Sequence, residues 1–261
     1  MAKLPPFPGT TGRRDWPTAF DAIRKLLANG DDTTQVFRIM KALNAGNAER
    51  NYARLLATEE GGRTAYQRVE LTQRLTDKAW VGQFAPGTVG AAYRAFLEAT
   101  GYSADGLAEV SKVIREDEMA HPYAWFGRRT RDVHDIWHVL TGYKADESLG
   151  EACLVAFSYA QVGGLGWAWI AGAASLKSLK VTGNRLFSKA VWEGYRNGRK
   201  AKWLIGEDYE ALMAEPIDAA RRRLGIVTPV AYLTAQRELG PELASYLSTQ
   251  RGQAAPATAT A

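Results

Sequence analysis

Two of the three histidines in this chain stand four residues apart, and an acid directly follows the first of them. These residues are His134, Asp135 and His138. On a helix with ~3.6 residues per turn, their side chains project within roughly 100° of one another. Two imidazoles and a carboxylate on one helix face are the ligands that a divalent metal ion needs. The spacing therefore predicts a metal site, with Glu151 on the next helix as a candidate fourth ligand.

Other interpretations of this run are weaker. Two structural histidines, with Asp135 paired to Arg131 one turn earlier, would leave Glu151 unexplained. A zinc protease has a glutamate, the catalytic base, directly after its first histidine, and this chain has an aspartate there. The third histidine, His121, would lie about 18 Å from the site along an unbroken helix, so it could approach only through a kink at Gly127.

The elements that must position these residues are predicted to be helices. Apolar residues recur at helical spacing in several segments, and glycines near 30, 46, 61–62 and 101 are predicted to end four of the helices. The segments are 16–27, 36–43, 52–56, 66–75, 89–97 and 107–114. Pro122 opens and Gly142 closes the helix that carries the histidines. We expect an all-α fold, with one domain of packed helices over 16–249, an N-terminal arm over 1–15 and a disordered tail over 250–261.

Residues 152–176 form a charge-free segment, since none of them has a charged side chain. A segment of this length could span a membrane. Four glycines interrupt the segment, and a break at Gly163-Gly164 would leave two pieces that are each too short to span. We therefore favour buried helices or the wall of an apolar cavity. Cys153, the only cysteine, lies in this segment and is predicted to be a core residue.

A basic belt follows, which we define as residues 177–203. It holds eight lysines and arginines against one acid, Glu193, and carries a net charge of +7. Apolar and aromatic residues are interleaved with the charges. This pattern favours an anionic lipid surface over a solvated helix face, and nucleic acid is not expected as a partner.

The run 123–142, together with Leu149-Gly150-Glu151, resembles the coenzyme Q biosynthesis protein 4 family. Segments at 86–93, 209–216 and 221–226 match as well, so the resemblance covers about residues 80–230. It implies an all-α, dimeric, metal-binding protein with an apolar cavity for an isoprenoid chain, acting in ubiquinone biosynthesis at a membrane. The expected partners are a polyprenylated quinone precursor or another isoprenoid lipid, the membrane surface, other ubiquinone-biosynthesis proteins and a second copy of the chain.

The resemblance also implies the metal ligands His134, Asp135, His138 and Glu151. Twelve residues separate His138 from Glu151, one more than the family's pattern, and the polar loop 143–148 can accommodate the extra residue. Glu147 is the alternative fourth ligand. The family is usually assigned zinc, whereas histidines and carboxylates with open positions also suit iron, so the identity of the divalent metal stays open.

The activity that the resemblance implies is an oxidative decarboxylation, in which hydroxyl replaces the C1 carboxylate of a polyprenylated benzoate. His134, Asp135 and His138 would be catalytic, and the substrate acid would be neutralised by one of three arginines, Arg128, Arg129 or Arg131. The alternative is a non-enzymatic, lipid-binding scaffold that organises the enzymes of the pathway. A metal-dependent prenyl-phosphate hydrolase is a third and weaker possibility.

The first residues, Met1 to Gly9, contain no apolar stretch typical of a secretory signal. They are also too short and too rich in proline for an amphipathic transit peptide. From this we predict a cytoplasmic protein that associates peripherally with the inner membrane.

Overall fold

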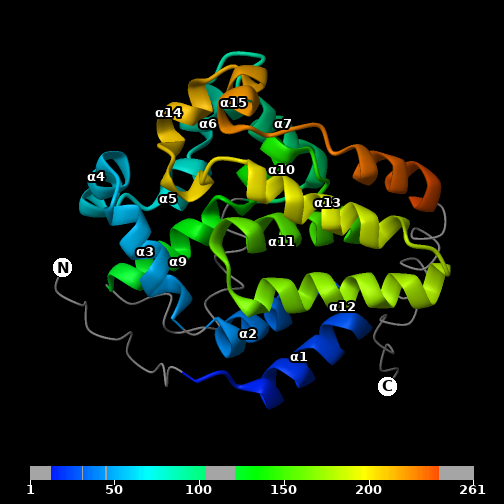
Figure 1. The fold of residues 1–261 in the computed structure, drawn as a ribbon. Coiled ribbons are helices and arrows are strands. Elements are labelled where there is room, and N and C mark those ends of the chain that lie inside the picture. Colours follow the sequence, from blue (N-terminus) through cyan, green and yellow to red (C-terminus); the bar gives the residue numbers. More distant parts are fainter. Residues whose placement is uncertain (1–12, 31, 45, 104–120, 241–261) are drawn as a thin grey trace, which may run out of the picture.

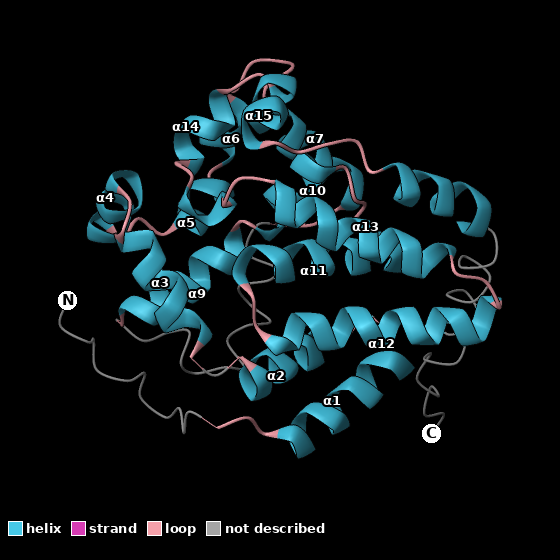
Figure 2. Cartoon of the chain, in the orientation of Figure 1, coloured by secondary structure: helices cyan, strands magenta, loops and turns pink. Residues whose placement is uncertain are grey.

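The protein is built from helices that pack into one body. The computed structural model describes residues 13–30, 32–44, 46–103 and 121–240, and this part of the chain contains no strand (Figures 1 and 2). The prediction of a single all-α domain is thereby confirmed. The predicted helix at 107–114 and the predicted tail at 250–261 lie outside the described residues, as does the predicted arm as far as residue 12.

The helices keep the labels of Figure 1, and their bounds are as follows: α1 Trp16–Ala28, α2 Thr33–Leu43, α3 Asn47–Leu56, α4 Glu59–Gln67, α5 Leu71–Thr76, α6 Lys78–Gly82, α7 Val89–Thr100, α9 Pro122–Asp132, α10 His134–Thr141, α11 Ser148–Val162, α12 Leu165–Thr182, α13 Leu186–Lys200, α14 Tyr209–Ala214 and α15 Ile217–Leu224. A short 3-10 turn spans Leu204–Gly206, and the chain is helical again over 230–240.

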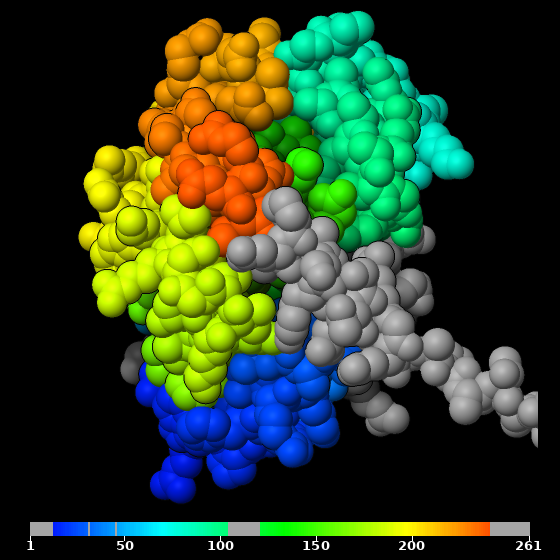
Figure 3. Space-filling model, turned by 90° about the vertical axis from the view of Figure 1, so that its right-hand side faces the viewer, coloured from blue at the N-terminus to red at the C-terminus, as the bar shows by residue number. Residues whose placement is uncertain are grey.

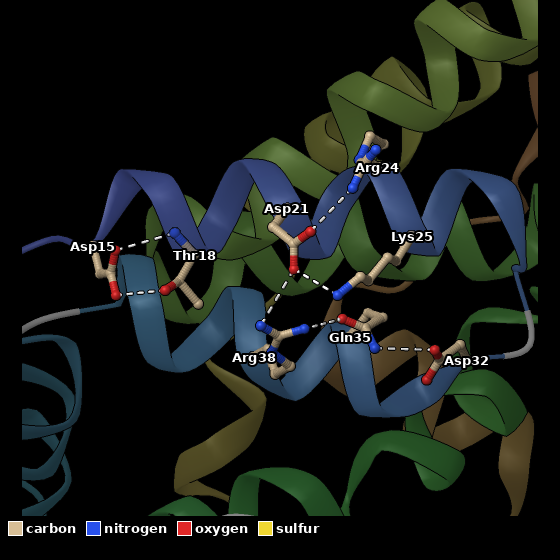
Figure 4. Close-up of polar contacts among 8 residues, drawn as sticks. All are labelled: Asp15, Thr18, Asp21, Arg24, Lys25, Asp32, Gln35 and Arg38. Atoms are coloured by element: carbon tan, nitrogen blue, oxygen red, sulfur yellow. Dashed lines mark hydrogen bonds and ion pairs between the residues drawn. The ribbon is translucent and has the colours of Figure 1, made fainter.

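The first two helices form a pair that packs beneath α12 (Figure 1). Asp15 caps α1, because its carboxylate accepts hydrogen bonds from the Thr18 N–H at 3.1 Å and the Thr18 hydroxyl at 2.6 Å. Asp21 lies between Lys25 of its own helix, at 2.7 Å, and Arg38 of α2, at 3.4 Å (Figure 4). The buried apolar residues of both helices, Ile23 and Leu26 of α1 and Ile39 and Leu43 of α2 among them, belong to the core.

The centre of the fold is the buried helix α11, which packs against α12 and α13. Gly194 and Gly198 of α13 allow a close approach, because a Cβ atom at these positions would lie 2.5 Å from the Cys153 carbonyl and 2.6 Å from the Phe157 carbonyl. Cys153 is fully buried, as predicted for a core residue. Each glycine therefore contributes by being small where two backbones nearly touch.

The charge-free segment breaks where its glycines predicted. Gly163 and Gly164 have φ values of 69° and 91°, a region that favours glycine, and they separate α11 from α12. Among the described residues, no helix combines the length and the hydropathy that crossing a membrane would require. The apolar cavity for a lipid stays a prediction.

Two helix boundaries predicted between residues 50 and 80 are wrong. Gly61 and Gly62 do not end a helix, since both lie inside α4, and α3 ends earlier at Leu56. The helix expected over 66–75 is divided between the end of α4 and the separate helix α5. Gly61 serves close packing, because a Cβ atom there would lie 2.3 Å from the carbonyl oxygen of Leu55.

Candidate metal centre

The helix expected over 122–142 is two helices, and their junction positions the histidines. Pro122 opens α9, which ends at Asp132, and Val133 separates it from α10. The interruption therefore lies at Val133, and Gly127 lies inside α9. His134 begins α10 and His138 lies one turn further on, so the two rings stack with their centroids 4.9 Å apart.

Glu151, in the first turn of α11, completes a group of three. One ligand atom from each of His134, His138 and Glu151 can be chosen so that all three lie within 4.8 Å of one another. The Nε2 atom of His138 lies 3.3 Å from one carboxylate oxygen of Glu151, and Nε2 of His134 lies 3.8 Å from the other. The alternative ligand Glu147 is engaged elsewhere, because it accepts hydrogen bonds from Tyr232 and Gln236.

His138 is held in one orientation by the loop that follows its helix. Its Nδ1 atom lies 2.8 Å from the backbone carbonyl of Tyr143, so Nδ1 carries the proton and donates it. This leaves the Nε2 lone pair directed at Glu151. A backbone carbonyl behind a ring nitrogen is a common support for a metal-binding histidine.

The ring nitrogens of this group fit a bound cation. Nε2 of His138 and Nδ1 of His134 are buried, and neither has a hydrogen-bond partner among the described residues. Leaving such an atom unsatisfied costs about 1–3 kcal/mol, which a bound cation or substrate would offset. Two imidazoles and one carboxylate, with further positions left open, form a donor set that binds divalent zinc or iron.

The electrostatics favour the ligand forms of His134 and Glu151, whereas His138 binds its proton more tightly and would give it up to a metal ion. Burial, assisted by the neighbouring His138, lowers the pKa of His134 to about 4, so this imidazole is neutral at pH 7. Burial acts against the charge of Glu151, but the two histidines outweigh it and lower the pKa of Glu151 below its usual range. Burial likewise opposes protonation of His138, and Glu151 with the Tyr143 carbonyl nevertheless raises the pKa of His138.

Asp135 does not belong to the group of three. Its direction on the helix differs by about 60° from that of His138, given ~100° per residue, and its side chain is short. It remains close enough to interact electrostatically: burial raises the pKa of Asp135 to about 6, the neighbouring His138 opposes this rise, and Glu151 and Asp132 add to it. Its role as a metal ligand stays a prediction.

The three arginines predicted to bind the substrate acid already have protein partners. Arg128 of α9 contacts Glu70 at 2.6 Å, and Arg131 contacts Asp132 at 2.7 Å. Arg129 is buried beneath Tyr209 and donates to the backbone carbonyl of Glu207 at 2.9 Å. Their role in binding a substrate stays a prediction.

His121 lies at the far end of α9, where it caps that helix. Its Nδ1 atom accepts a hydrogen bond from the backbone N–H of Tyr123 at 3.2 Å. It is absent from the metal-binding group found among the described residues, as its distance along the helix predicted.

Two residues of the centre were missed by sequence reasoning. Phe96 of α7 stacks on the ring of His138 with centroids 6.0 Å apart, and Tyr143 supplies the carbonyl behind the same ring. Phe96 belongs to an apolar stripe that predicted its helix, but a stripe does not say which element it will face. Tyr143 acts through its backbone, which leaves no signal in the sequence.

Fold and site together define an all-α protein with a candidate binding centre for a divalent metal. The chain belongs to the coenzyme Q (ubiquinone) biosynthesis protein Coq4 family, whose model matches residues 25–230. This confirms the family resemblance drawn from the sequence and extends it toward the N-terminus.

Individual relatives agree with this assignment. A protein of Pyrenophora tritici-repentis named ubiquinone biosynthesis protein coq4, mitochondrial, is 31% identical over 190 residues, which cover 67% of this chain and 58% of that protein. A protein of Scheffersomyces stipitis with the corresponding name is 29% identical, over 67% of this chain and 53% of its own. A homologue from Danio rerio is 29% identical, with coverages of 67% and 63%. The chain thus spans between half and two thirds of the length of these relatives.

The fold has a counterpart among solved structures. A crystal structure from Nostoc punctiforme PCC 73102, provisionally described as that of a ubiquinone biosynthesis protein, superposes with a TM-score of 0.61. The two sequences are 21% identical, and the superposition covers 82% of this chain and 100% of the Nostoc chain. At that level of identity the likeness establishes a shared fold.

The predicted cytoplasmic location is wrong. The relatives from Pyrenophora, Scheffersomyces and Danio are all named as mitochondrial proteins. The prediction rested on the lack of a recognisable leader among the first residues, and such a lack is no positive signal for any compartment.

Proposed function

We propose that this chain is a metal-dependent enzyme of ubiquinone biosynthesis that replaces the C1 carboxylate of a polyprenylated benzoate with hydroxyl. The carbon–carbon bond to the carboxylate breaks, carbon dioxide leaves, and a carbon–oxygen bond forms at the same ring carbon. This is a two-electron oxidation, for which dioxygen is the proposed oxidant: water supplies the hydroxyl oxygen, and dioxygen takes up two electrons and two protons and leaves as hydrogen peroxide. Membership of the Coq4 family supports the pathway.

The observation that carries the proposal is the convergence of His134, His138 and Glu151 from two helices. One buried ring nitrogen of each histidine has no hydrogen-bond partner within the part of the chain that the structure describes. A cation bound there would supply a Lewis acid for a substrate oxygen and, in the case of iron, a route for electrons that zinc does not offer. His134 and His138 would bind it as neutral imidazoles, and Glu151 would supply the negative charge. Phe96 covers one face of His138 and shields it from water.

The first experiment compares metal content and turnover in matched variants. Protein is purified under anaerobic conditions, its metals are determined by mass spectrometry, and a short-chain prenylated hydroxybenzoate is offered with oxygen. We expect His138→Ala to lose at least about tenfold in metal affinity and all release of carbon dioxide, since it removes a ligand. The control is His121→Asn, which changes the third histidine but retains a side chain able to cap α9.

The outcomes separate the proposal from its alternatives. Wild-type protein that binds one metal ion but never releases carbon dioxide would contradict the decarboxylase. If His138→Ala still assembles with other ubiquinone-biosynthesis proteins while the carboxylated precursor accumulates in cells, the scaffold interpretation fails. Turnover by zinc-loaded protein free of iron would exclude the iron version.

We further propose that the basic belt places the site at an anionic membrane. Among its eight basic residues, all but Lys177 are exposed. Near the turn between α12 and α13 the exposed side chains include apolar ones, with Leu176 64% and Val181 48% exposed. Figure 3 views the face on which this turn, in yellow-green, reaches the surface. An isoprenoid substrate, other pathway proteins and a second copy of the chain remain the proposed partners.

A further inference from the structure

The helical segment 230–240 contacts the loop that connects the two ligand-bearing helices. This loop, residues 143–147, follows the His138 helix and precedes the Glu151 helix. Tyr232 of the segment is 1% exposed, and its hydroxyl donates to the Glu147 carboxylate at 2.5 Å. The same hydroxyl accepts the backbone N–H of Lys144 at 3.1 Å.

The Tyr232 ring also contacts the loop residue that orients His138. It packs edge-on against the ring of Tyr143 with centroids 5.1 Å apart and an interplanar angle of 90°. The carbonyl of Tyr143 is the acceptor for Nδ1 of His138. A single side chain thus touches the loop at three points, namely Tyr143, Lys144 and Glu147.

The opposite side of the loop rests on the helix that carries Glu151. A Cβ atom at Gly150 would lie 2.0 Å from the carbonyl oxygen of Lys144, so the loop backbone is in close contact with α11 there. Lys144 is held between Tyr232 on one side and Gly150, the neighbour of Glu151, on the other. Movement of this backbone would therefore affect both ligand-bearing helices.

Tyr232 has its own support from a third helix. Its backbone N–H donates to the Glu193 carboxylate of α13 at 3.1 Å, at the start of the helical segment. Gln236, one turn further on, donates to Glu147 at 3.1 Å and to the Tyr232 hydroxyl at 3.2 Å. Burial raises the pKa of Tyr232 far above its usual range, so its hydroxyl keeps the proton that Glu147 accepts.

We infer that Tyr232 is a positioning residue of the metal centre. It fixes the loop so that the Tyr143 carbonyl orients the His138 imidazole toward Glu151. This inference rests on the metal site of the proposed function. It reaches beyond the residues that the family model matches, because that match ends at residue 230.

The test compares two variants that each delete one buried tyrosine hydroxyl. Tyr232→Phe removes the hydroxyl that bonds Lys144 and Glu147 of the loop, and it keeps the ring that packs on Tyr143. The control Tyr209→Phe removes a hydroxyl in an equally buried side chain. That hydroxyl makes two hydrogen bonds, against three at Tyr232: one from the Trp137 indole at 2.7 Å and one to the Leu204 carbonyl at 3.0 Å. Cobalt(II) and zinc(II) are titrated by calorimetry, the visible spectrum of the cobalt form is recorded, and the metal-free proteins are melted.

We expect both variants to melt at lower temperature without metal. Only Tyr232→Phe should lose about tenfold or more in metal affinity and change the cobalt absorption bands, because it alone frees the support behind a ligand. Wild-type affinity and spectrum in Tyr232→Phe would overturn the inference. An equal loss of affinity in Tyr209→Phe would also overturn it, since the effect would then be general destabilisation.

A second pair covers the case in which Tyr232→Phe fails to fold. Glu147→Gln retains an oxygen that can accept the Tyr232 hydrogen bond, whereas Glu147→Leu has none. We expect metal affinity near that of wild type for the first and a loss of about tenfold for the second. Equal affinities would contradict the inference. If wild-type protein binds neither metal, the proposed metal site is wrong, and so is the inference that rests on it. If wild type and all variants bind metal equally well, only the positioning role of Tyr232 is wrong.

Discussion

The individual residues of the centre differ in how far sequence spacing determines their positions. His134 and His138 share a helix, so a separation of four residues is enough to place their rings side by side. Glu151 lies on the next helix, so its distance from the histidines depends on the conformation of the loop between α10 and α11. Asp135 lies on the same helix but projects in a different direction from the two histidines. Sequence spacing shows that the three residues share a broad helix face, but it does not show which of them reach the same point.

Asp135 gives a prediction about pH. Its pKa in the folded protein is about 6, above the value of 3.8 for an ordinary aspartate, so the folded state binds the proton more tightly. For metal-free protein this side chain therefore lowers stability as pH rises from about 4 to 6, and the loss persists above that. We expect Asp135→Asn to raise the free energy of unfolding at pH 8 by on the order of 2 kcal/mol and to have little effect at pH 4.

Urea unfolding at several pH values, with chelator present, measures this effect. The control is Asp132→Asn, which should destabilise the protein at pH 8, because Asp132 pairs with Arg131 and accepts the Thr72 N–H. A constant difference between Asp135→Asn and wild type across the pH range would contradict the prediction. The same variant tests the ligand prediction, since weaker metal binding by Asp135→Asn would support it.

At the scale of elements, neighbouring glycines can have opposite roles. Gly61 and Gly62 both lie inside α4. A Cβ atom at Gly61 would lie 2.3 Å from the Leu55 carbonyl, whereas at Gly62 the nearest atom is 3.9 Å away. We expect Gly62→Ala to stabilise the protein by about 0.5–1 kcal/mol through helix propensity, and Gly61→Ala to destabilise it by forcing α3 and α4 apart.

Thermal melting of the two variants provides the measurement, and each serves as the control for the other. Because both changes add one methyl group to one helix, effects on the unfolded chain are nearly equal. Equal shifts of the melting temperature in the same direction would show that α3 and α4 do not touch at Gly61.

The same glycines show what the sequence reveals about elements. The helical periodicity predicted the all-α fold, and Gly163-Gly164 predicted the break in the charge-free segment. Gly61-Gly62 was predicted to end a helix in the same way. Gly61 is instead needed because two helices pack closely there, and such a tertiary requirement leaves no local sequence pattern. The separation of α9 from α10 at Val133 likewise has no local signal, because no glycine or proline stands among residues 131–135.

At the scale of the whole molecule, charge is distributed unevenly. The chain carries +5 in total and the basic belt alone +7, so the remaining residues together carry −2. A charge concentrated on one face attracts anionic lipid far more strongly than the same charge spread over the surface. The exposed Leu176 and Val181 add apolar contact at the same place.

Vesicle sedimentation tests this arrangement. We expect the protein to bind phosphatidylserine vesicles, to bind phosphatidylcholine vesicles weakly, and to dissociate as salt is added. Lys180→Glu should reduce binding by about tenfold, since each basic residue near the surface contributes about 1 kcal/mol. Lys78→Glu makes the same change in net charge on the remote helix α6 and should bind like wild type. Equal losses in both variants would show that net charge, and not the basic belt, governs binding.

The one acid in the basic belt places a limit on how its surface can change. The Glu193 carboxylate accepts the backbone N–H of Tyr232, so it anchors the segment that supports the loop between the ligands. A lysine at 193 would make the belt more basic but would remove that anchor and set a cation beside an N–H group. Substitutions that adapt the basic belt to more acidic lipids must therefore occur at its other positions, because the residue at 193 also holds an internal hydrogen bond.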